Sequence, residues 1–341
     1  MTSILYKISC LMGRVTVGRW RSCIVYMLIG LVLLPSAPSY GVDITVDQTT
    51  HSFGADPVVD SAQNGVPVVN IASPSQAGVS ANYFKDYNVA QAGVIMNNSL
   101  NMGRSQLGGL LYQNPHFTQN RAAQIVLFEV TGAGQSRMEG YSEMFGQAAD
   151  FVLANPNGIY VNGAGFINIP RVTFTTGQPD WDGMGRFSGL TVDQGQVEVG
   201  KLGLNVGQVD YFDIISRSII LNGTVWAGKS LSMVTGQNYV SYDTSIVSPI
   251  DFSQHTVDTP ALGIDAIALG AVYAGSIRLV STEMGVGVRL HGDIMAYTGN
   301  IDITSHGDIV YHSLTSSDEL SVRSAGDVAQ LDTSYATHSL K

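Results

Sequence analysis

The sequence predicts an all-β protein, and three observations support this fold class. Only 13% of the 341 residues are charged and 38 are Gly, which suits short strands joined by tight turns. Period-2 alternation of apolar residues is frequent after residue 41, where no segment keeps a helical period over three turns. Residues 301–310 and 320–329 share their apolar positions, a Ser and a Gly-Asp pair. Their offset of 19 residues favours a β-solenoid, with a β-sandwich as the alternative.

The first 39 residues predict an extended secretory signal peptide. Four basic residues precede an apolar run at 23–34, and small residues follow up to Ser39, near which we expect cleavage. The run holds twelve residues, whereas a helix that spans a bilayer needs about 20. An uncleaved N-terminal anchor is the alternative interpretation.

Removal of this segment changes the character of the remaining chain. Both cysteines, Cys10 and Cys23, lie within it, so the exported part has none and cannot form disulfides. Four of the 17 Lys and Arg residues leave with it and none of the 27 Asp and Glu residues do, which leaves 13 against 27 and a formal net charge of −14. Because such a surface repels phosphate backbones, nucleic acid is excluded as a partner.

The expected strands are short and end at Gly, Asn or Asp. The clearest alternating runs are 42–46, 125–130, 172–176, 197–199 and 301–303. Three further segments repeat the apolar pattern at looser spacing, namely 190–192, 231–233 and 277–279. In a solenoid, equivalent positions of successive coils stack on one another, so these segments are expected to lie in register.

Candidate chemistry is sparse. His291-Gly-Asp293 and His306-Gly-Asp308 could place His and Asp on neighbouring coils, but Ala325-Gly-Asp327 repeats the pattern without His, which favours a turn signature. Motifs for zinc proteases, phosphate-binding loops and serine hydrolases are absent from the sequence. A β-helical polysaccharide lyase would need a cluster of Asp residues for calcium with Arg or Lys nearby, and the sequence contains no such cluster. We therefore predict no catalytic residues, metal or cofactor, and no enzymatic activity.

The sequence Asn155-Pro-Asn-Gly158 has the residues of a tight turn. Pro fixes one φ, whereas Asn and Gly tolerate positive φ. The amide side chains are expected to cap a neighbouring coil.

Taken in order, the motifs resemble the N-terminal secretion and haemagglutination domain of filamentous haemagglutinin-like exoproteins from Gram-negative two-partner secretion. The segments that carry the resemblance are 67–71, 74–80, 82–89, 107–109, 114–117, 129–132, 154–159, 163–168 and 175–177. Residues 211–242 and 265–288 are similar to the haemagglutinin segment that follows in that family.

The resemblance implies a right-handed parallel β-helix with an N-terminal capping sheet and small β extensions. It also implies Sec-dependent entry into the periplasm and recognition there by the POTRA domains of an outer-membrane β-barrel transporter. The exoprotein then crosses the pore extended, without ATP, and folds at the cell surface or in the medium.

Family motifs map onto two sets of residues. The secretion motifs, which the transporter would recognise, correspond to Asn114, Pro115, Phe117, Asn155, Pro156, Asn157, Gly158 and Ile159. The structural motif residues are Asn82, Phe84, Asn88, Glu129 and Asn168. The first secretion motif departs from the usual pattern, with His116 and Phe117 in place of Asn and Leu, and Phe128 stands where many relatives have Asn.

The resemblance divides the chain into the signal peptide (1–39), the secretion domain (40–280) and the start of further β-helical repeats (281–341), expected to be truncated. Three functions are compatible with it. An adhesin or haemagglutinin would bind host or neighbouring-cell surface receptors. A contact-dependent growth inhibition protein would carry a toxin further along, and a β-helical polysaccharide-active enzyme would need an acidic groove.

Overall fold

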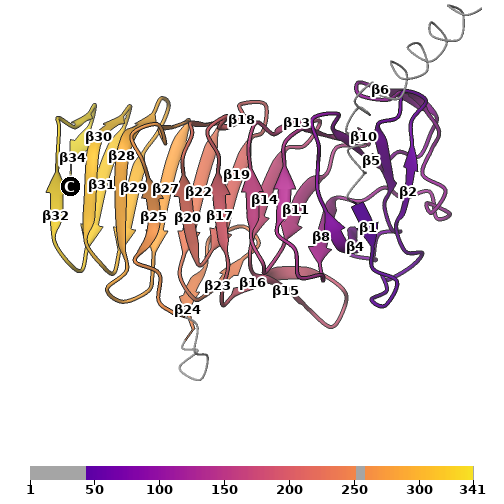
Figure 1. The fold of residues 1–341 in the computed structure, drawn as a ribbon, viewed down its shortest axis with the longest axis horizontal. Coiled ribbons are helices and arrows are strands. Elements are labelled where there is room, and N and C mark those ends of the chain that lie inside the picture. Colours follow the sequence, from indigo (N-terminus) through magenta and orange to yellow (C-terminus); the bar gives the residue numbers. More distant parts are fainter. Residues whose placement is uncertain (1–43, 251–257, 341) are drawn as a thin grey trace, which may run out of the picture. The chain divides into compact units, whose positions relative to one another are not determined.

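The computed structural model describes residues 44–250 and 258–340, which form strands, turns and loops with no helix among them. The predicted signal peptide and its cleavage near Ser39 lie outside the described residues. Figure 1 shows the strands stacked along the long axis in the order of the sequence.

An eleven-stranded sheet forms one face of the stack. All its strands run parallel except β1, which pairs antiparallel with β4. In spatial order the strands are β1 (Ile44–Val46), β4 (Val79–Tyr87), β8 (Ile125–Val130), β11 (Asp150–Ala154), β14 (Arg171–Thr175), β19 (Tyr211–Ser216), β22 (Ser230–Thr235), β27 (Ser276–Ser281), β29 (Ile301–Ser305), β31 (Glu319–Ser324) and β34 (Ser339–Leu340).

Two further sheets supply the remaining faces. The five-stranded sheet consists of β13 (Gly165–Ile167), β10 (Tyr141–Gly146), β5 (Val94–Asn98), β3 (Pro67–Asn70) and β2 (Val58–Ser61). The twelve-stranded sheet contains β18 (Leu204–Val206), β21 (Val225–Ala227), β26 (Val272–Ala274), β28 (Gly287–Ala296), β25 (Leu262–Ala266), β20 (Ser218–Leu221), β17 (Gln196–Val199), β12 (Ile159–Val161), β9 (Ser136–Met138), β30 (Ile309–Ser316), β32 (Val328–Gln330) and β33 (Tyr335–Ala336).

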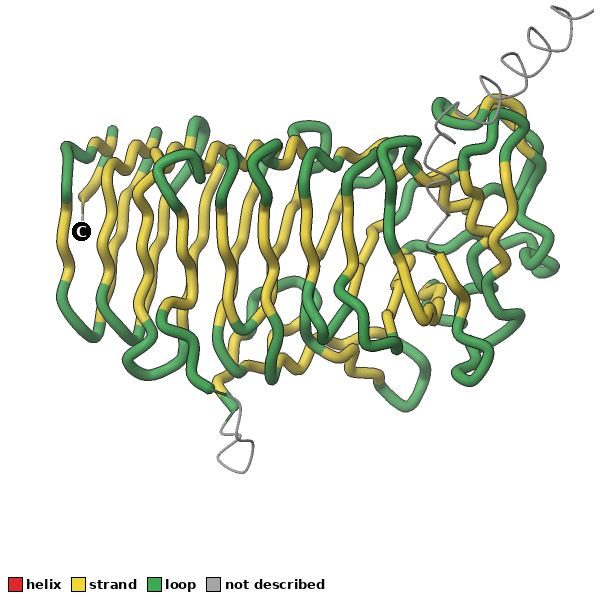
Figure 2. The backbone as a smooth tube through the Cα atoms, viewed as in Figure 1, coloured by secondary structure: helices red, strands yellow, loops and turns green. Residues whose placement is uncertain are grey.

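The chain path identifies these sheets as the walls of a parallel β-helix. Each coil takes a strand from the eleven-stranded sheet and then two more from the other faces, as in β8, β9 and β10, before β11 starts the next coil beside β8. In later coils the long strands β28 and β30 supply both of the other faces. Figure 2 shows the resulting stack of strands with turns at its corners. The predicted solenoid is therefore confirmed, and the sandwich alternative is wrong.

The register confirms most of the predicted repeat. Ile301 pairs with Leu320, the predicted offset of 19 residues, and Leu231, Ile277 and Ile301 lie in one column of the same sheet. The prediction for residues 190–192 is wrong, because these residues belong to β16 (Phe187–Val192) in a separate antiparallel sheet. That sheet interrupts the coils, which is why the repeat spacing is irregular.

The extra sheet has four strands from two hairpins. The first hairpin, β15 (Gln178–Trp181) and β16, leaves the helix after β14, and the second, β23 (Asn238–Ser241) and β24 (Val247–Pro249), leaves it after β22. Near the N-terminal end, β6 (Gly103–Ser105) and β7 (Gly109–Leu111) form another hairpin. Antiparallel edge strands β1 and β2 cover that end. The predicted cap and small β extensions correspond to these elements.

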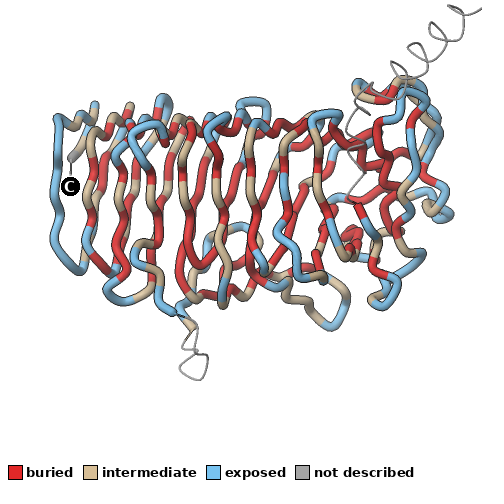
Figure 3. Tube along the Cα trace, in the orientation of Figure 1, coloured by how far each residue is buried: buried red, intermediate tan, exposed pale blue. Residues whose placement is uncertain are grey.

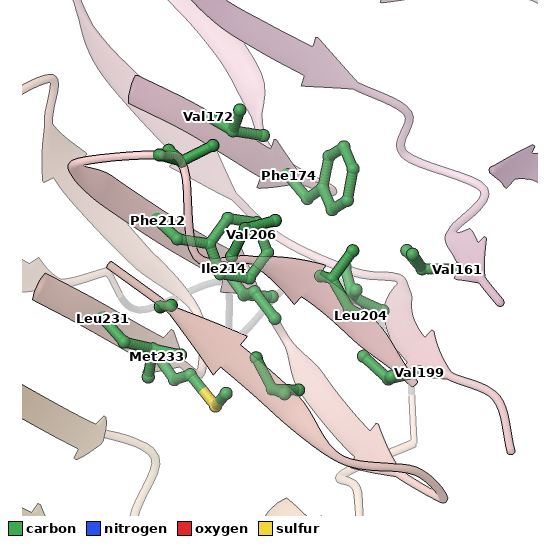
Figure 4. Close-up of a cluster of buried hydrophobic side chains, with 14 of the residues drawn as sticks. Val161, Val172, Phe174, Val199, Leu204, Val206, Phe212, Ile214, Leu231 and Met233 are labelled. Carbon is green, nitrogen blue, oxygen red and sulfur yellow. The ribbon is translucent and has the colours of Figure 1, made fainter. Parts of the chain in front are cut away.

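The core lies inside the coils and is aromatic in its first half. Figure 3 shows buried strands joined by exposed turns. Phe84, Phe128 and Phe151 stack on successive coils with ring centroids 4.8 and 5.3 Å apart. Phe166 links Phe151 to Phe174 at 6.5 and 5.9 Å, and Phe174 lies 5.8 Å from Phe212. Apolar residues such as Leu231 and Met233 follow in the next coil (Figure 4). The rings are not equivalent in register, because Phe84 pairs with Val130 and Phe128 with Leu153, so inward side chains of one coil pack diagonally on those of the next.

A buried charge cluster lies where the four-stranded sheet meets the outer surface of the eleven-stranded sheet. The Arg171 guanidinium lies 3.2 Å from an Asp213 carboxylate oxygen and donates to the Tyr242 carbonyl at 3.1 Å. The Tyr242 hydroxyl donates to Asp150. Burial raises the pKa of Asp213 to about 6 and also raises the pKa of Asp150.

Asp213 makes the stability of the fold depend on pH. Its folded-state pKa of about 6 exceeds the ordinary value of 3.8, so the folded state binds the proton more tightly than the unfolded state. This contribution is fully present below about pH 4 and is lost as the pH rises through 6, on the order of 1–3 kcal/mol. We expect wild type to lose melting temperature between pH 4.5 and pH 7 relative to Asp213→Asn, which cannot ionise. Parallel melting curves for the two proteins at both pH values would contradict this assignment.

Candidate functional site

The second predicted secretion motif, residues 155–159, contains a hydrogen-bonded turn between β11 and β12. The Gly158 N–H donates to the Asn155 carbonyl at 3.0 Å, and the Asn157 N–H donates to the Asn155 side-chain oxygen at 2.9 Å. Pro at the second position and Gly at the fourth are typical of a type I turn. Gly158 has φ +103°, which an L-residue rarely adopts. The predicted tight turn is confirmed.

The amide groups of this turn hold the preceding coil. The Asn155 amide donates to the Gly134 carbonyl at 2.9 Å and to the Ser136 hydroxyl at 3.0 Å. The Asn157 amide donates to the Gly132 carbonyl at 2.8 Å. Because Gly132, Gly134 and Ser136 all belong to the β8–β9 corner, the two Asn side chains link neighbouring coils, as the sequence predicted.

The first predicted secretion motif, at residues 114–117, has the same hydrogen-bond scheme between β7 and β8. The Phe117 N–H donates to the Asn114 carbonyl at 3.3 Å, and the His116 N–H donates to the Asn114 side-chain oxygen at 2.9 Å. The Asn114 amide then donates to the carbonyls of Ile71 and Asn97 at 2.9 and 2.7 Å. The departure at His116 and Phe117 therefore leaves the turn intact.

Burial separates the motif residues into two groups. Asn155, Gly158 and Ile159 are buried, and so is Asn114. The residues that reach the surface are Asn157 and Pro115, which are exposed, and Pro156 and Phe117, which are half-buried. The Phe117 ring packs against the main core.

Each turn lies beside a surface hollow. A groove of about 750 Å³ is lined by Pro115, His116 and Phe117, with Phe53 and Arg121 among its other walls. A shallower hollow of about 410 Å³ is lined by Asn157, Gln135 and Gln196. The exposed side chains of the two motifs therefore lie in two separate hollows.

The predicted structural motif residues form hydrogen bonds or core contacts within the fold. The Asn82 amide donates to the Ser80 and Leu127 carbonyls, and its oxygen accepts the Ala72 N–H at 2.8 Å. Asn88 accepts the Arg137 N–H at 2.8 Å.

At the end of β13, Asn168 takes φ +60° while its amide donates to the Met144 and Gly146 carbonyls. Phe84 belongs to the aromatic column, and burial raises the pKa of Glu129 in β8.

Comparison with known proteins identifies the family. Residues 42–311 match the family model described as the TPS secretion domain, where TPS denotes two-partner secretion. The chain belongs to the TPS secretion domain family. A crystal structure of the filamentous hemagglutinin secretion domain superimposes with a TM-score of 0.79 and 35% identity, covering 87% of this chain and 98% of that one.

Two curated relatives show the range of proteins that carry this TPS secretion domain. The chain is 40% identical over 290 residues to the filamentous hemagglutinin of Bordetella pertussis. The alignment covers 82% of this chain and 8% of that protein. The chain is 42% identical over 299 residues to the 16S rRNA endonuclease CdiA of Enterobacter cloacae, in an alignment that covers 87% of this chain and 9% of that protein. The chain therefore spans less than a tenth of the length of these relatives.

Sequence reasoning missed several buried residues of this TPS secretion domain. Asn98 is buried, its amide donates to the Ala123 and Gln147 carbonyls, and its oxygen accepts the Ala123 N–H. The Asn97 amide donates to the Asn70 side chain at 2.8 Å. Asn residues at the ends of strands were the available signal, but only the pairing of distant coils shows which carbonyls they reach.

The His-Gly-Asp segments differ from one another. Gly307-Asp308 and Gly326-Asp327 form equivalent turns, in which Asp308 accepts the Asp327 N–H at 2.8 Å. The turn prediction for Gly292-Asp293 is wrong, because both residues lie inside β28. Across residues 44–250 and 258–340, no group of three or more His, Cys, Asp or Glu side chains is placed to hold a metal ion. Within the same residues, no helix has the length and apolarity to span a membrane.

Gly158 is a position where both backbone and space exclude a side chain. A Cβ would lie 2.8 Å from the Gln196 carbonyl oxygen, and φ is +103°. We expect Gly158→Ala to lower the free energy of unfolding by more than about 1 kcal/mol. Gly65→Ala is the matched control, because φ there is +85° but no atom lies within 4 Å of the added Cβ. Chemical denaturation of both variants should show the larger loss for Gly158→Ala, and equal losses would rule out the steric contribution.

Proposed function

We propose that this TPS secretion domain is recognised in the periplasm by the POTRA domains of an outer-membrane β-barrel transporter, after Sec-dependent entry directed by residues 1–39. The chain then crosses the pore extended and folds outside the cell. The observation that carries this proposal is the family match over residues 42–311. Two sequence features support it. Both cysteines lie before residue 40, and only 13% of residues are charged, so the threaded chain has no cross-links and few ions to desolvate.

Within this proposal the two Asn-Pro turns are the secretion motifs. Because recognition precedes folding outside the cell, we assign transporter contact to all members of the two motifs. Once the domain has folded, the side chains of Asn155 and Asn114 are buried and bonded inside the fold, whereas Asn157 and Pro115 remain exposed. The division between a secretion domain ending near residue 280 and further repeats stays a prediction.

Export from cells that carry the partner transporter tests the proposal. A passenger fused after Lys341 should appear outside the cell, and deletion of residues 41–280 should retain it in the periplasm. Deletion of residues 319–340 serves as the control, since it removes β31 to β34 but leaves both motifs and the four-stranded sheet. Continued export of the passenger without residues 41–280 would overturn the secretion role.

For the whole protein we propose an adhesin or haemagglutinin without enzymatic activity in the described region, in line with the relative named filamentous hemagglutinin. A specific observation favours a second candidate. Relatives at 37–42% identity are named as CdiA nucleases or as toxin CdiA, which favours a contact-dependent growth inhibition protein. Sequencing the DNA that follows the codon for Lys341 decides between them, since adhesive repeats or a toxin region would be encoded there.

A further inference from the structure

The four-stranded sheet packs on the β-helix across many coils. Its buried apolar side chains Phe187, Leu190, Val192 and Val240 form one cluster with outward-facing residues of the eleven-stranded sheet. Those partners come from five different strands, β4, β8, β11, β19 and β22, and they are Val79, Leu127, Val152, Ile215 and Val234. Figure 1 shows the four strands lying along one side of the stacked coils.

Polar contacts extend this attachment in both directions. The Arg171 guanidinium and the Asp150 carboxylate hold Tyr242, and Arg278 donates to the Thr244 carbonyl at 3.2 Å. On the N-terminal side, the Ser75 hydroxyl donates to the Gly185 carbonyl at 3.0 Å, and Phe53 packs edge-on against Trp181 at 5.3 Å. Contacts of one small sheet thus run from the first coil to β27.

This arrangement differs from the usual solenoid. In a repeat fold each coil contacts only its neighbours, so stability is a sum of local terms and the ends can open alone. Here the sheet contacts coils that do not touch one another. It also requires both hairpins, because β16 pairs with β23 through Gly189 and Ser241, 52 residues apart. Neither hairpin alone provides the complete sheet.

We propose that the four-stranded sheet is a clasp, which closes after the coils beneath it have formed and makes β4 through β22 open as one cooperative unit. Given the export function proposed above, an emerging chain would remain locally reversible until residues 178–192 and 238–249 are on the same side of the membrane. Closure of the clasp would then fix the folded domain outside.

Hydrogen–deuterium exchange of the full chain in solution tests the clasp. The clasp variant is the double substitution Leu190→Ala with Val240→Ala, which removes two buried side chains of the small sheet. We expect amides of β4, β8, β11 and β19 to exchange about tenfold faster or more, and together, while β29 and β31 keep their rates. The matched control is Leu314→Ala with Val288→Ala, which removes the same two side-chain types from later coils. It should accelerate β29 and β31 but not β8 and β11.

Two results would overturn the clasp. Faster exchange confined to β15, β16, β23 and β24 would mean that the sheet only rests on the coils. Acceleration of β8 and β11 by the control variant would mean that the helix itself is the cooperative unit. Tyr242→Phe keeps the test informative if the double variant does not fold, because it removes only the hydroxyl bonded to Asp150 and should accelerate the same strands less. No transporter takes part, so failure of the export proposal would leave these results unchanged.

Discussion

Replacement of Phe128 by alanine is expected to lower the free energy of unfolding by about 3–5 kcal/mol. The Phe128 side chain is 0% exposed and lies in the aromatic column, with ring centroids 4.8 Å from Phe84, 5.0 Å from Tyr87 and 5.3 Å from Phe151. Deletion of the ring would leave a cavity whose walls belong to three successive coils. Since the ladder hydrogen bonds fix the spacing of those coils, the walls cannot collapse to fill it.

Equilibrium denaturation in urea measures this loss. Phe53→Ala is the matched control, because Phe53 is 54% exposed and contacts Trp181 at the surface. Its substitution should cost no more than about 1 kcal/mol. Phe128→Leu should lie between the two, because it keeps most of the apolar volume. A Phe128→Ala protein as stable as the Phe53→Ala control would mean that the aromatic column contributes little to the fold.

The position of Phe128 illustrates what the sequence could predict. Alternation over residues 125–130 predicted a strand, and β8 has those bounds. Local alternation is sufficient there because inward and outward side chains of one strand face different environments. The resemblance also identified Phe128 as a departure from the family pattern, but the contacts of its ring became visible only when coils separated by more than twenty residues were placed side by side.

The two wrong predictions concern segments whose structure is decided by residues far away in the sequence. Residues 190–192 have the alternation of a coil strand, and nothing local distinguishes them from residues 231–233. Their assignment depends on pairing with β23, about fifty residues later, which the period of one segment does not encode. Similarly, Gly292-Asp293 has turn residues, yet it lies within a long strand because β28 serves two faces of the helix. Non-local pairing decides the sheet to which residues 190–192 belong, and it overrides the local turn preference of Gly292-Asp293.

For the candidate site, the sequence predicted the turn and its capping role, but not which of its two Asn side chains is buried and which is exposed. Asn155 and Asn157 are equivalent in composition arguments, since either could contact a transporter or a carbonyl. The structure distinguishes them, because Asn155 is 0% exposed and Asn157 lies at the surface. We therefore expect replacement of Asn155 to lower the stability of the fold much more than replacement of Asn157.

Asn155→Ala is expected to lower the free energy of unfolding by about 2–4 kcal/mol. The substitution removes the hydrogen bonds to the Gly134 carbonyl, the Ser136 hydroxyl and the Asn157 N–H, of which only Ser136 is buried. A typical hydrogen bond contributes about 0.5–1.5 kcal/mol, and a buried polar group left unpaired costs about 1–3 kcal/mol. Asn155→Asp should not restore the stability, because a carboxylate can accept the Asn157 N–H but cannot donate to Gly134. Thermal and urea denaturation of the two variants measure these losses, and a fully stable Asn155→Ala protein would show that the clamp is dispensable.

Asn157→Ala is the matched control, because it removes the same type of side chain from the same turn, at a position that is exposed. It loses one hydrogen bond, to the Gly132 carbonyl, and should cost about 0.5–1.5 kcal/mol. Measured together, stability and export then separate two roles of one motif. If the transporter reads the exposed side chain, Asn157→Ala lowers export out of proportion to its small effect on stability. Asn155→Ala should lower both export and stability, because the transporter meets the motif before folding and the folded domain then needs the Asn155 amide.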